Sequence, residues 1–146
     1  YWSGLTSTAF DAFSLVPASF GHQGNYGPGM YFVSNESSGD NEIILWDLTD
    51  DMSGTPALNS FAISTTAYSP AADAFQAGSG DQLDNGDCRI QNAFYLNGIL
   101  HFVFHSDIGE GWNGINYNRL YVSDLEIASD MFGLQGSYDY AYPAVA

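Results

Sequence analysis

The fold class is decided by residues 91–104, which read Gln91-Asn92-Ala93-Phe94-Tyr95-Leu96-Asn97-Gly98-Ile99-Leu100-His101-Phe102-Val103-Phe104. Two runs rich in apolar and aromatic residues flank Asn97-Gly98. This dipeptide is typical of type I′ hairpin turns, in which both central residues need a positive φ. Because side chains alternate along a strand, His101 and Val103 should share one face and Phe102 the other. The stretch therefore predicts an antiparallel β-hairpin.

The same pattern recurs along the chain, which indicates a repeat protein. Residues 91–95 are similar to residues 16–20 and to residues 142–146. After each of the first two copies come a second apolar run, a polar loop with glycine, and an aromatic-rich run ending in Asp-Leu. The copies are unevenly spaced because residues 66–88 form a connection rich in Gly, Ser, Asp and Ala. Without this connection each unit has about fifty residues, close to the length of a four-stranded propeller blade.

We therefore predict an all-β fold of two four-stranded antiparallel β-propeller-like blades plus the first strand of a third, as a fragment of a larger propeller. The expected division is residues 1–14 as the end of a preceding blade or a linker, 15–65 as repeat 1, 66–88 as the connection, 89–140 as repeat 2, and 141–146 as the first strand of a third repeat. Strands are expected over 15–22, 30–35, 42–49, 58–65, 89–96, 99–107, 119–126 and 132–138. Residues 71–78 could instead form one helical turn. The expected partners are neighbouring blades of the same polypeptide, because such units bury their faces against one another.

Charge and composition narrow the class of protein further. The 146 residues include seventeen acidic residues, two arginines and no lysine, for a formal net charge of -15, and 45% of them are hydrophobic. Such a chain repels phosphate backbones and anionic membrane surfaces, so we expect no nucleic-acid partner. The longest apolar stretches have the length of strands, so membrane insertion is not expected. A strongly acidic surface suits a secreted or cell-surface protein.

The single cysteine, Cys88, offers neither a disulfide nor a zinc site, since it has no second cysteine and no ligands at zinc spacing. A catalytic thiol needs a cation beside it, and Arg89 is adjacent in sequence. Neighbouring residues on a strand point to opposite faces, however. We therefore interpret Cys88 as a small buried residue.

Residues 87–98, 114–120 and 138–143 resemble the propeller regions of large secreted proteins from Bacteroidetes-type bacteria, which are associated with type IX secretion. The resemblance implies a sialidase-like β-propeller repeat architecture and a secreted or cell-surface location. A sialidase site needs three arginines, and Arg89 and Arg119 are the only two in this sequence. The implied function is a non-catalytic interaction or adhesion scaffold, or secretion cargo, with secretion or cell-surface proteins as partners. The alternative is part of a sialidase-like or other glycan-active propeller enzyme or lectin whose site residues lie mostly outside this chain.

Two groups of residues are candidates for ligand binding. Trp112, Tyr117 and Arg89 are the carbohydrate-binding candidates, because rings in Gly-rich loops can stack on sugars. Propeller cores also use many aromatic residues, so a structural role is the alternative. Residues 105–112 match the sialidase Asp-box imperfectly, with the Asp, Gly and Trp in place and His for Ser. Such a box stabilises a turn, with the Asp bonding loop amides, and marks no catalyst.

Ca²⁺ is the candidate cofactor, with Asp81, Asp84 and Asp87 as its predicted ligands. Calcium takes carboxylate and carbonyl oxygens from flexible loops, and this loop, which also contains Asn85 and Gly86, supplies both. It lacks the alternating acidic spacing of an EF-hand, so a solvated acidic turn is the alternative. His101 and His105 also suggest a metal pair, but four residues of strand span about 13 Å, which is too far for one ion.

Overall fold

The computed structural model describes residues 14–20, 29–49 and 55–146, and over these residues it is all-β, with no helix. The strands are β1 (Val16–Pro17), β2 (Gly29–Asn35), β3 (Asp40–Thr49), β4 (Ala57–Tyr68), β5 (Ala74–Phe75), β6 (Gln82–Leu83), β7 (Asn92–Leu96), β8 (Ile99–Asp107), β9 (Asn113–Tyr121) and β10 (Glu126–Phe132). In this part of the chain no helix is long and apolar enough to cross a membrane.

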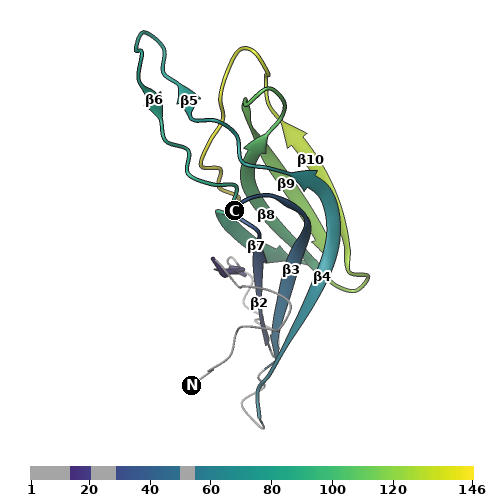
Figure 1. Cartoon of the computed structure of the whole chain (residues 1–146). Helices are drawn as coiled ribbons and strands as arrows, with labels where there is room; N and C mark the ends of the chain where they lie inside the picture. Colours follow the sequence, from purple (N-terminus) through teal and green to yellow (C-terminus); the bar gives the residue numbers. More distant parts are fainter. Residues whose placement is uncertain (1–13, 21–28, 50–54) are drawn as a thin grey trace.

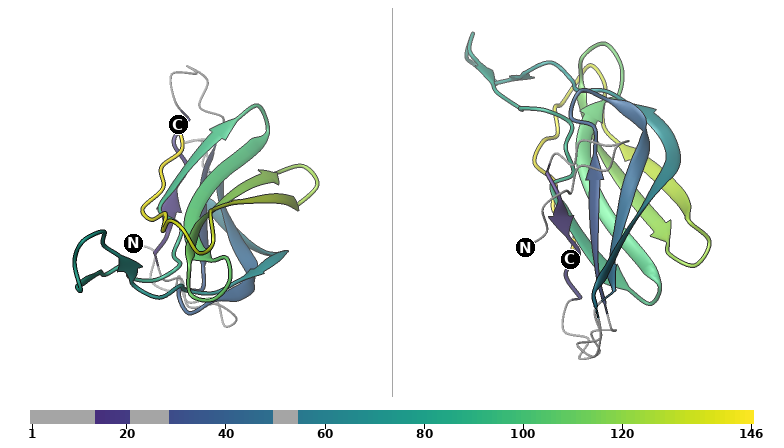
Figure 2. Two further views of the ribbon diagram at one scale, coloured as in Figure 1. Left: turned by 90° about the horizontal axis from the view of Figure 1, so that it is seen from above. Right: turned by 60° about the horizontal axis from the view of Figure 1, so that its bottom comes forward.

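The strands form two four-stranded sheets and one small hairpin (Figure 1). The first sheet has the order β1-β2-β3-β4 and the second the order β7-β8-β9-β10, and every pairing is antiparallel. Each sheet is thus a meander in which neighbours in sequence are neighbours in space. The hairpin of β5 and β6 lies between the sheets in sequence and projects away from both of them (Figure 2). The prediction of antiparallel, all-β structure is confirmed.

The hairpin that decided the fold class is formed as predicted. Asn97 and Gly98 have φ values of 51° and 86°, the positive pair that a type I′ turn requires. Phe94 is paired with His101 and Ala93 with Phe102, so the two faces of β8 alternate as expected. Phe102 lies on the face toward the first sheet, and His101 lies on the opposite face, hereafter the outer face of the second sheet.

The last two strands of the second sheet differ from the prediction. The expected strand over 119–126 contains a turn at 122–125, where Leu125 has a φ of 55°, and the expected strand over 132–138 is not a strand beyond Phe132. Residues 113–118 have the composition of a loop, yet they begin β9. The reason is that two of their asparagine side chains bind serines on the neighbouring strands: Asn116 Nδ2 donates to Ser106 Oγ at 3.3 Å, and Asn118 Oδ1 accepts from Ser129 Oγ at 2.6 Å.

Two further expectations are corrected. Residues 71–78 form no helical turn; β5 lies within them and pairs with β6. Residues 141–146 form no strand, because a strand needs a partner backbone in register. This segment meets the second sheet through side chains, with Tyr142 N donating to His105 Nδ1 at 3.4 Å and Val145 N donating to Asn92 Oδ1 at 3.0 Å. Nearly all of the predicted segment 1–14, and the end of the predicted strand 15–22, lie outside the described residues.

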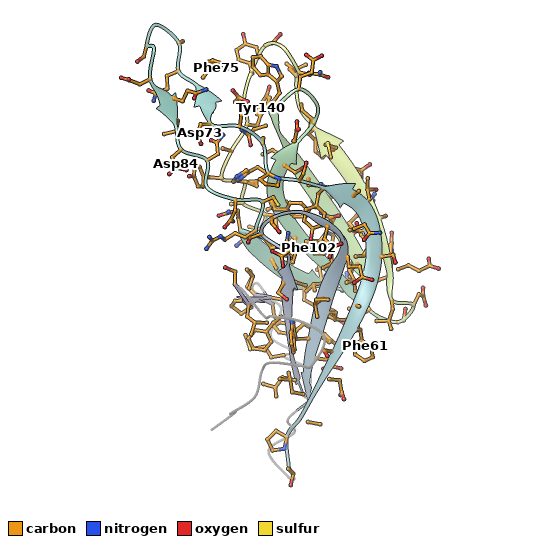
Figure 3. The ribbon with its side chains drawn as sticks, viewed as in Figure 1. Phe61, Asp73, Phe75, Asp84, Phe102 and Tyr140 are labelled. Atoms are coloured by element: carbon orange, nitrogen blue, oxygen red, sulfur yellow. The ribbon has the colours of Figure 1, made fainter. Side chains whose placement is uncertain are left out.

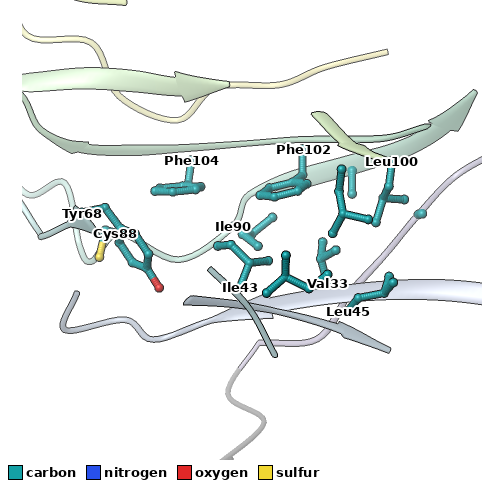
Figure 4. Close-up of a cluster of buried hydrophobic side chains, with 13 residues drawn as sticks. Val33, Ile43, Leu45, Tyr68, Cys88, Ile90, Leu100, Phe102 and Phe104 are labelled. Atoms are coloured by element: carbon teal, nitrogen blue, oxygen red, sulfur yellow. The ribbon is translucent and has the colours of Figure 1, made fainter. Parts of the chain in front are cut away.

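The hydrophobic core lies between the two sheets (Figure 4). The first sheet contributes Val33, Ile43, Leu45 and Ile63, and the second contributes Ala93, Leu100, Phe102, Phe104 and Leu120. Ile90, from the segment that leads into β7, lies between them. At one end of the core Tyr68 packs edge-on against Phe104, with ring centroids 5.0 Å apart. The core therefore belongs to the interface between the sheets rather than to either sheet alone.

The sheets pack with equivalent strands beside each other. At one edge β1 lies next to β7, where Ser19 N donates to Ala93 O at 3.1 Å and Tyr95 N donates to Ser19 O at 2.7 Å. At the other edge β4 lies next to β10, where Thr65 Oγ1 is 3.0 Å from Ser129 Oγ. The first strands of the two sheets are thus adjacent, and so are the last strands.

Candidate functional site

The three predicted calcium ligands do not form one site in the structure. Asp87 is bound by Arg89, whose Nε is 2.6 Å from Asp87 Oδ1 and whose Nη2 contacts Oδ2. The hydrogen bonds from Arg89 lower the pKa of Asp87 below its ordinary value. Asp81 Oδ2 accepts from Ser79 Oγ at 3.3 Å, and Asp84 Oδ1 accepts from Gly86 N at 2.7 Å. Each carboxylate thus stabilises its own local turn or ion pair.

Nowhere in residues 14–20, 29–49 and 55–146 do three His, Cys, Asp or Glu side chains come close enough to hold a metal ion together. His101 and His105 are on one face of β8, as predicted, and each has its own partners. His105 is buried, with Nε2 2.9 Å from Asn85 O and Nδ1 3.4 Å from Tyr142 N. Because Tyr142 N–H can only donate, the proton of a neutral His105 is on Nε2 and is donated to Asn85 O. Burial lowers the pKa of His105, in keeping with this neutral form.

The three carbohydrate candidates also lie apart. Trp112 belongs to the loop between β8 and β9, and its ring centroid is 5.9 Å from that of Phe75 on β5. Tyr117 lies within β9 on the outer face of the second sheet. Arg89 precedes β7 and is bound to Asp87. The structure therefore brings Trp112 together with Phe75, which the sequence did not suggest, and not with Tyr117 or Arg89.

The loop that resembles an Asp-box is held in its turn by hydrogen bonds within the loop. Asp107 Oδ1 accepts from Gly109 N at 2.7 Å and from Gly111 N at 3.2 Å. Within the same loop Ile108 N donates to Trp112 O at 2.9 Å. The aspartate bonds the loop amides, which is the role predicted for it, and the turn holds Trp112 where its ring contacts Phe75 of β5.

A row of stacked side chains crosses the outer face of the second sheet. The rings of Phe94 and His101 are parallel with centroids 4.6 Å apart, and Tyr117 continues the row at 6.0 Å from His101. The hydroxyl of Tyr117 is 2.7 Å from His101 Nδ1. Arg119 lies over the Tyr117 ring and is paired with Asp130 at 2.8 Å. The stacking of Phe94 on His101 could have been predicted from the sequence, because the two residues lie at matching positions on either side of the Asn97-Gly98 turn. The contact of Tyr117 with His101 could not, because it depends on the register of β9.

A polar junction of five residues, Ala72, Asp73, Asn85, Asn113 and Asp139, lies where the β5–β6 hairpin meets the second sheet. The carbonyl oxygen of Ala72 accepts from Asn85 Nδ2 and from Asn113 Nδ2, each at 2.9 Å. Asp139 Oδ1 accepts from Asn113 N at 2.8 Å, and Asp73 Oδ1 accepts from Asn85 N at 3.4 Å. Of these residues, sequence reasoning considered only Asn85, as a neighbour of the predicted calcium ligands. No local pattern links the other residues, which come from different segments of the chain.

Cys88 is a buried structural thiol, as predicted. Its Sγ is 3.2 Å from Ser37 O, in the turn between β2 and β3. Burial raises the pKa of the Cys88 thiol from 9.0 to about 11. The group is therefore protonated at neutral pH, when a nucleophilic cysteine would need to be a thiolate.

Two features offer chemistry for binding: the aromatic pair of exposed Phe75 and half-buried Trp112, and the polar junction at Ala72. Both depend on the β5–β6 hairpin, which Figure 3 shows with Phe75 and Asp73 on one of its arms and Asp84 on the other. Comparison of the chain with protein-family models, with curated proteins and with solved structures found no match.

Proposed function

We propose that the chain is a non-catalytic, β-propeller-like segment of a secreted or cell-surface protein, which stacks on further repeats of the same polypeptide and acts as an interaction scaffold. The observation that carries the proposal is the strand-for-strand packing of the two sheets, with β1 beside β7 and β4 beside β10. Consecutive blades of a propeller pack in this way. In a sandwich of two unrelated sheets, the first strands need not be adjacent to each other, nor the last strands.

The links from one repeat to the next also support the proposal. In the first sheet Asn35, at the end of β2, donates to Cys88 O and accepts from Ile90 N, both at 2.8 Å. In the second sheet His105, near the end of β8, accepts from Tyr142 N. In both cases a side chain on the second strand of one sheet, β2 or β8, binds the backbone of the segment that follows that sheet. These backbone positions lie at or just before the next copy of the repeated segment, residues 91–95 or residues 142–146. The two units are thus joined to the next copy in equivalent ways.

The outer face of the second sheet has the composition of a surface that is covered by another repeat. It carries Phe94, Tyr117 and Phe132, and the side chain of Phe132 is 57% exposed. Residues 141–146 approach this face at Asn92. Exposed aromatic rings on a sheet face mark a site for association. A third repeat stacked here would bury these rings as the first sheet buries Phe102.

The test is the intact mass of the native polypeptide together with hydroxyl-radical footprinting of its side chains. We expect a mass several times the 15.8 kDa of this chain. We also expect Phe132 to be oxidised much more slowly than Phe75, although both are exposed here. A mass equal to that of this chain would contradict the proposal. So would a heavier polypeptide in which Phe132 and Phe75 react at the same rate.

A second candidate function is glycan binding, either by a lectin or by a glycan-active propeller whose remaining site residues lie outside this chain. The aromatic pair Phe75 and Trp112 favours it, since Phe75 is 71% exposed at the end of the molecule and Trp112 is half-buried beside it. Tyr140, also exposed, lies near this end of the molecule (Figure 3). Flat apolar rings at a surface are suited to the apolar faces of sugars.

If this second candidate is correct, Trp112→Ala is expected to weaken saturable glycan binding by about tenfold, or about 1.4 kcal/mol, because buried aromatic anchors carry much of the energy of an interface. Tyr117→Ala is the control, since Tyr117 lies in the row on the outer face and apart from Trp112. Affinities are measured on sugars identified with a glycan array. Equal loss in both variants would argue against a site at Trp112.

A further inference from the structure

The polar junction at Ala72 gathers side chains from four separate segments of the chain. Asn85 and Asn113 both donate to Ala72 O, which brings their carboxamides to the same carbonyl group. Asp139 accepts from Asn113 N and, through its other oxygen, from Phe75 N at 3.1 Å. Asp73 follows Ala72 directly and accepts from Asn85 N. Two carboxamides therefore meet at one backbone carbonyl, and a carboxylate binds the backbone N–H of each of the two asparagines.

Two oxygens at this junction have no partner among the described residues. Asn85 and Asn113 have exposed fractions of 2% and 0%, and neither Oδ1 has a hydrogen-bond donor there. The amide orientation follows from the contacts, because each Nδ2 donates to a carbonyl oxygen that cannot itself donate. A buried acceptor without a partner is destabilising because its desolvation is not compensated, and few such groups occur in a native fold. Two of them, on carboxamides that share one carbonyl, point to a further binding partner at the junction.

The charge at the junction indicates the kind of ligand. Asp73 and Asp139 bring two carboxylates, and within the described part of the chain the hydrogen bonds that these carboxylates accept come from backbone amides. The two arginines of the chain are engaged elsewhere, Arg89 with Asp87 and Arg119 with Asp130, and there is no lysine. A dissolved cation can offset this charge where no basic side chain does.

We propose that the junction is a Ca²⁺ site, in which the Oδ1 atoms of Asn85 and Asn113 and the carboxylates of Asp73 and Asp139 are ligands. Calcium takes six to eight oxygens, including carboxylates and amide carbonyls, in flexible geometry. Two carboxylates balance its charge. Zinc prefers nitrogen and sulfur, and magnesium demands closer to ideal octahedral geometry, so this donor set suits calcium better than either. The site is distinct from the loop of Asp81, Asp84 and Asp87, and it is independent of the stacking proposal.

Bound calcium would tie the β5–β6 hairpin to the second sheet. Ala72, Asp73 and Asn85 belong to the segments at the base of the hairpin, whereas Asn113 begins β9 and Asp139 follows β10. The same ion would thereby hold Phe75 against Trp112, since Phe75 N is bound by Asp139. Calcium is therefore expected to order the aromatic end of the molecule.

The experiment is a titration of the metal-free chain with Tb³⁺, a luminescent substitute for Ca²⁺ that is excited through nearby indole rings. Trp112 precedes the ligand Asn113, so bound Tb³⁺ is expected to give sensitised, saturable emission that Ca²⁺ displaces more readily than Mg²⁺ does. Asp139→Asn keeps one oxygen as a hydrogen-bond acceptor and removes the negative charge, and we expect at least tenfold weaker binding. Asp81→Asn, at the far end of the hairpin, is the matched control and should bind as the wild type does.

Each other outcome overturns the proposal. Absence of saturable emission means that water alone satisfies the two amide oxygens. Unchanged binding in Asp139→Asn excludes the junction, and loss of binding in Asp81→Asn places the ion in the loop of Asp81, Asp84 and Asp87. If circular dichroism shows that Asp139→Asn is unfolded, Asp73→Asn replaces it with the same expectation, because its carboxylate accepts only a long bond from Asn85 N.

Discussion

Replacement of Phe102 by alanine is expected to destabilise the fold by about 3–5 kcal/mol, the range found when a buried phenylalanine is truncated to alanine. The Phe102 side chain is fully buried and lies between the sheets, among core residues from both (Figure 4). Truncation removes apolar area from the interior and leaves a cavity that two packed sheets cannot close. Because a domain of this size is stable by about 5–15 kcal/mol, the loss is a large part of the whole. The free energy of unfolding is measured by urea denaturation.

Phe132→Ala is the matched control for Phe102→Ala, because the same atoms are removed from the same sheet. Phe132 lies on the outer face and is mostly exposed. Its truncation should change the free energy of unfolding of this chain by less than about 1 kcal/mol. Equal losses in the two variants would show that the assignment of the two faces of the second sheet is wrong.

Replacement of Asn35 by alanine is the second change for which we expect a large effect, a loss of about 2–4 kcal/mol. Asn35 is buried, and its carboxamide joins the end of β2 to the backbone at Cys88 and Ile90. Alanine leaves a buried carbonyl oxygen and a buried N–H without partners, and each incurs its desolvation cost. The loss is measured by urea denaturation of the variant and the wild type.

Asn41→Ala is the control for Asn35→Ala. Asn41 is exposed, near the start of β3, and we expect its replacement to change the free energy of unfolding by about 0.5 kcal/mol or less. If Asn35→Ala is as stable as Asn41→Ala, the link between the first sheet and the segment before β7 contributes nothing to the free energy of unfolding. The equivalence of the links at Asn35 and His105, which supports the stacking proposal, would then lose its energetic basis.

The sequence predicted more of the first sheet than of the second. Strands β2 and β3 lie within two residues of their expected bounds, because each is a continuous apolar run between turn residues. For β9 the prediction began six residues late, since Gly114, Asn116 and Asn118 have poor strand propensity. They occupy a strand because Ser106 and Ser129 on the neighbouring strands hydrogen-bond to the side chains of Asn116 and Asn118. Tertiary hydrogen bonds thus override a local preference.

The prediction of the candidate sites was weaker than that of the strands. The sequence showed that Asp81, Asp84 and Asp87 are close along the chain, but each carboxylate is bound to its own neighbour two residues away. Proximity in sequence favours such local turns over a shared ion. Trp112 was predicted as an exposed aromatic, and its partner Phe75 was not, because they are joined only through the position of the β5–β6 hairpin.

By itself the sequence determined the all-β class, the Asn97-Gly98 turn and the two faces of β8, because turn φ angles and the alternation of side chains are local properties of the chain. Only the tertiary structure decided which face is buried against which sheet, and which polar residues meet at Ala72. Asn85, Asn113 and Asp139 come from segments separated by more than twenty residues, and the hydrogen bond from Asn113 Nδ2 to Ala72 O forms only when the base of the hairpin packs on the second sheet. No local pattern in a sequence encodes contacts of that kind.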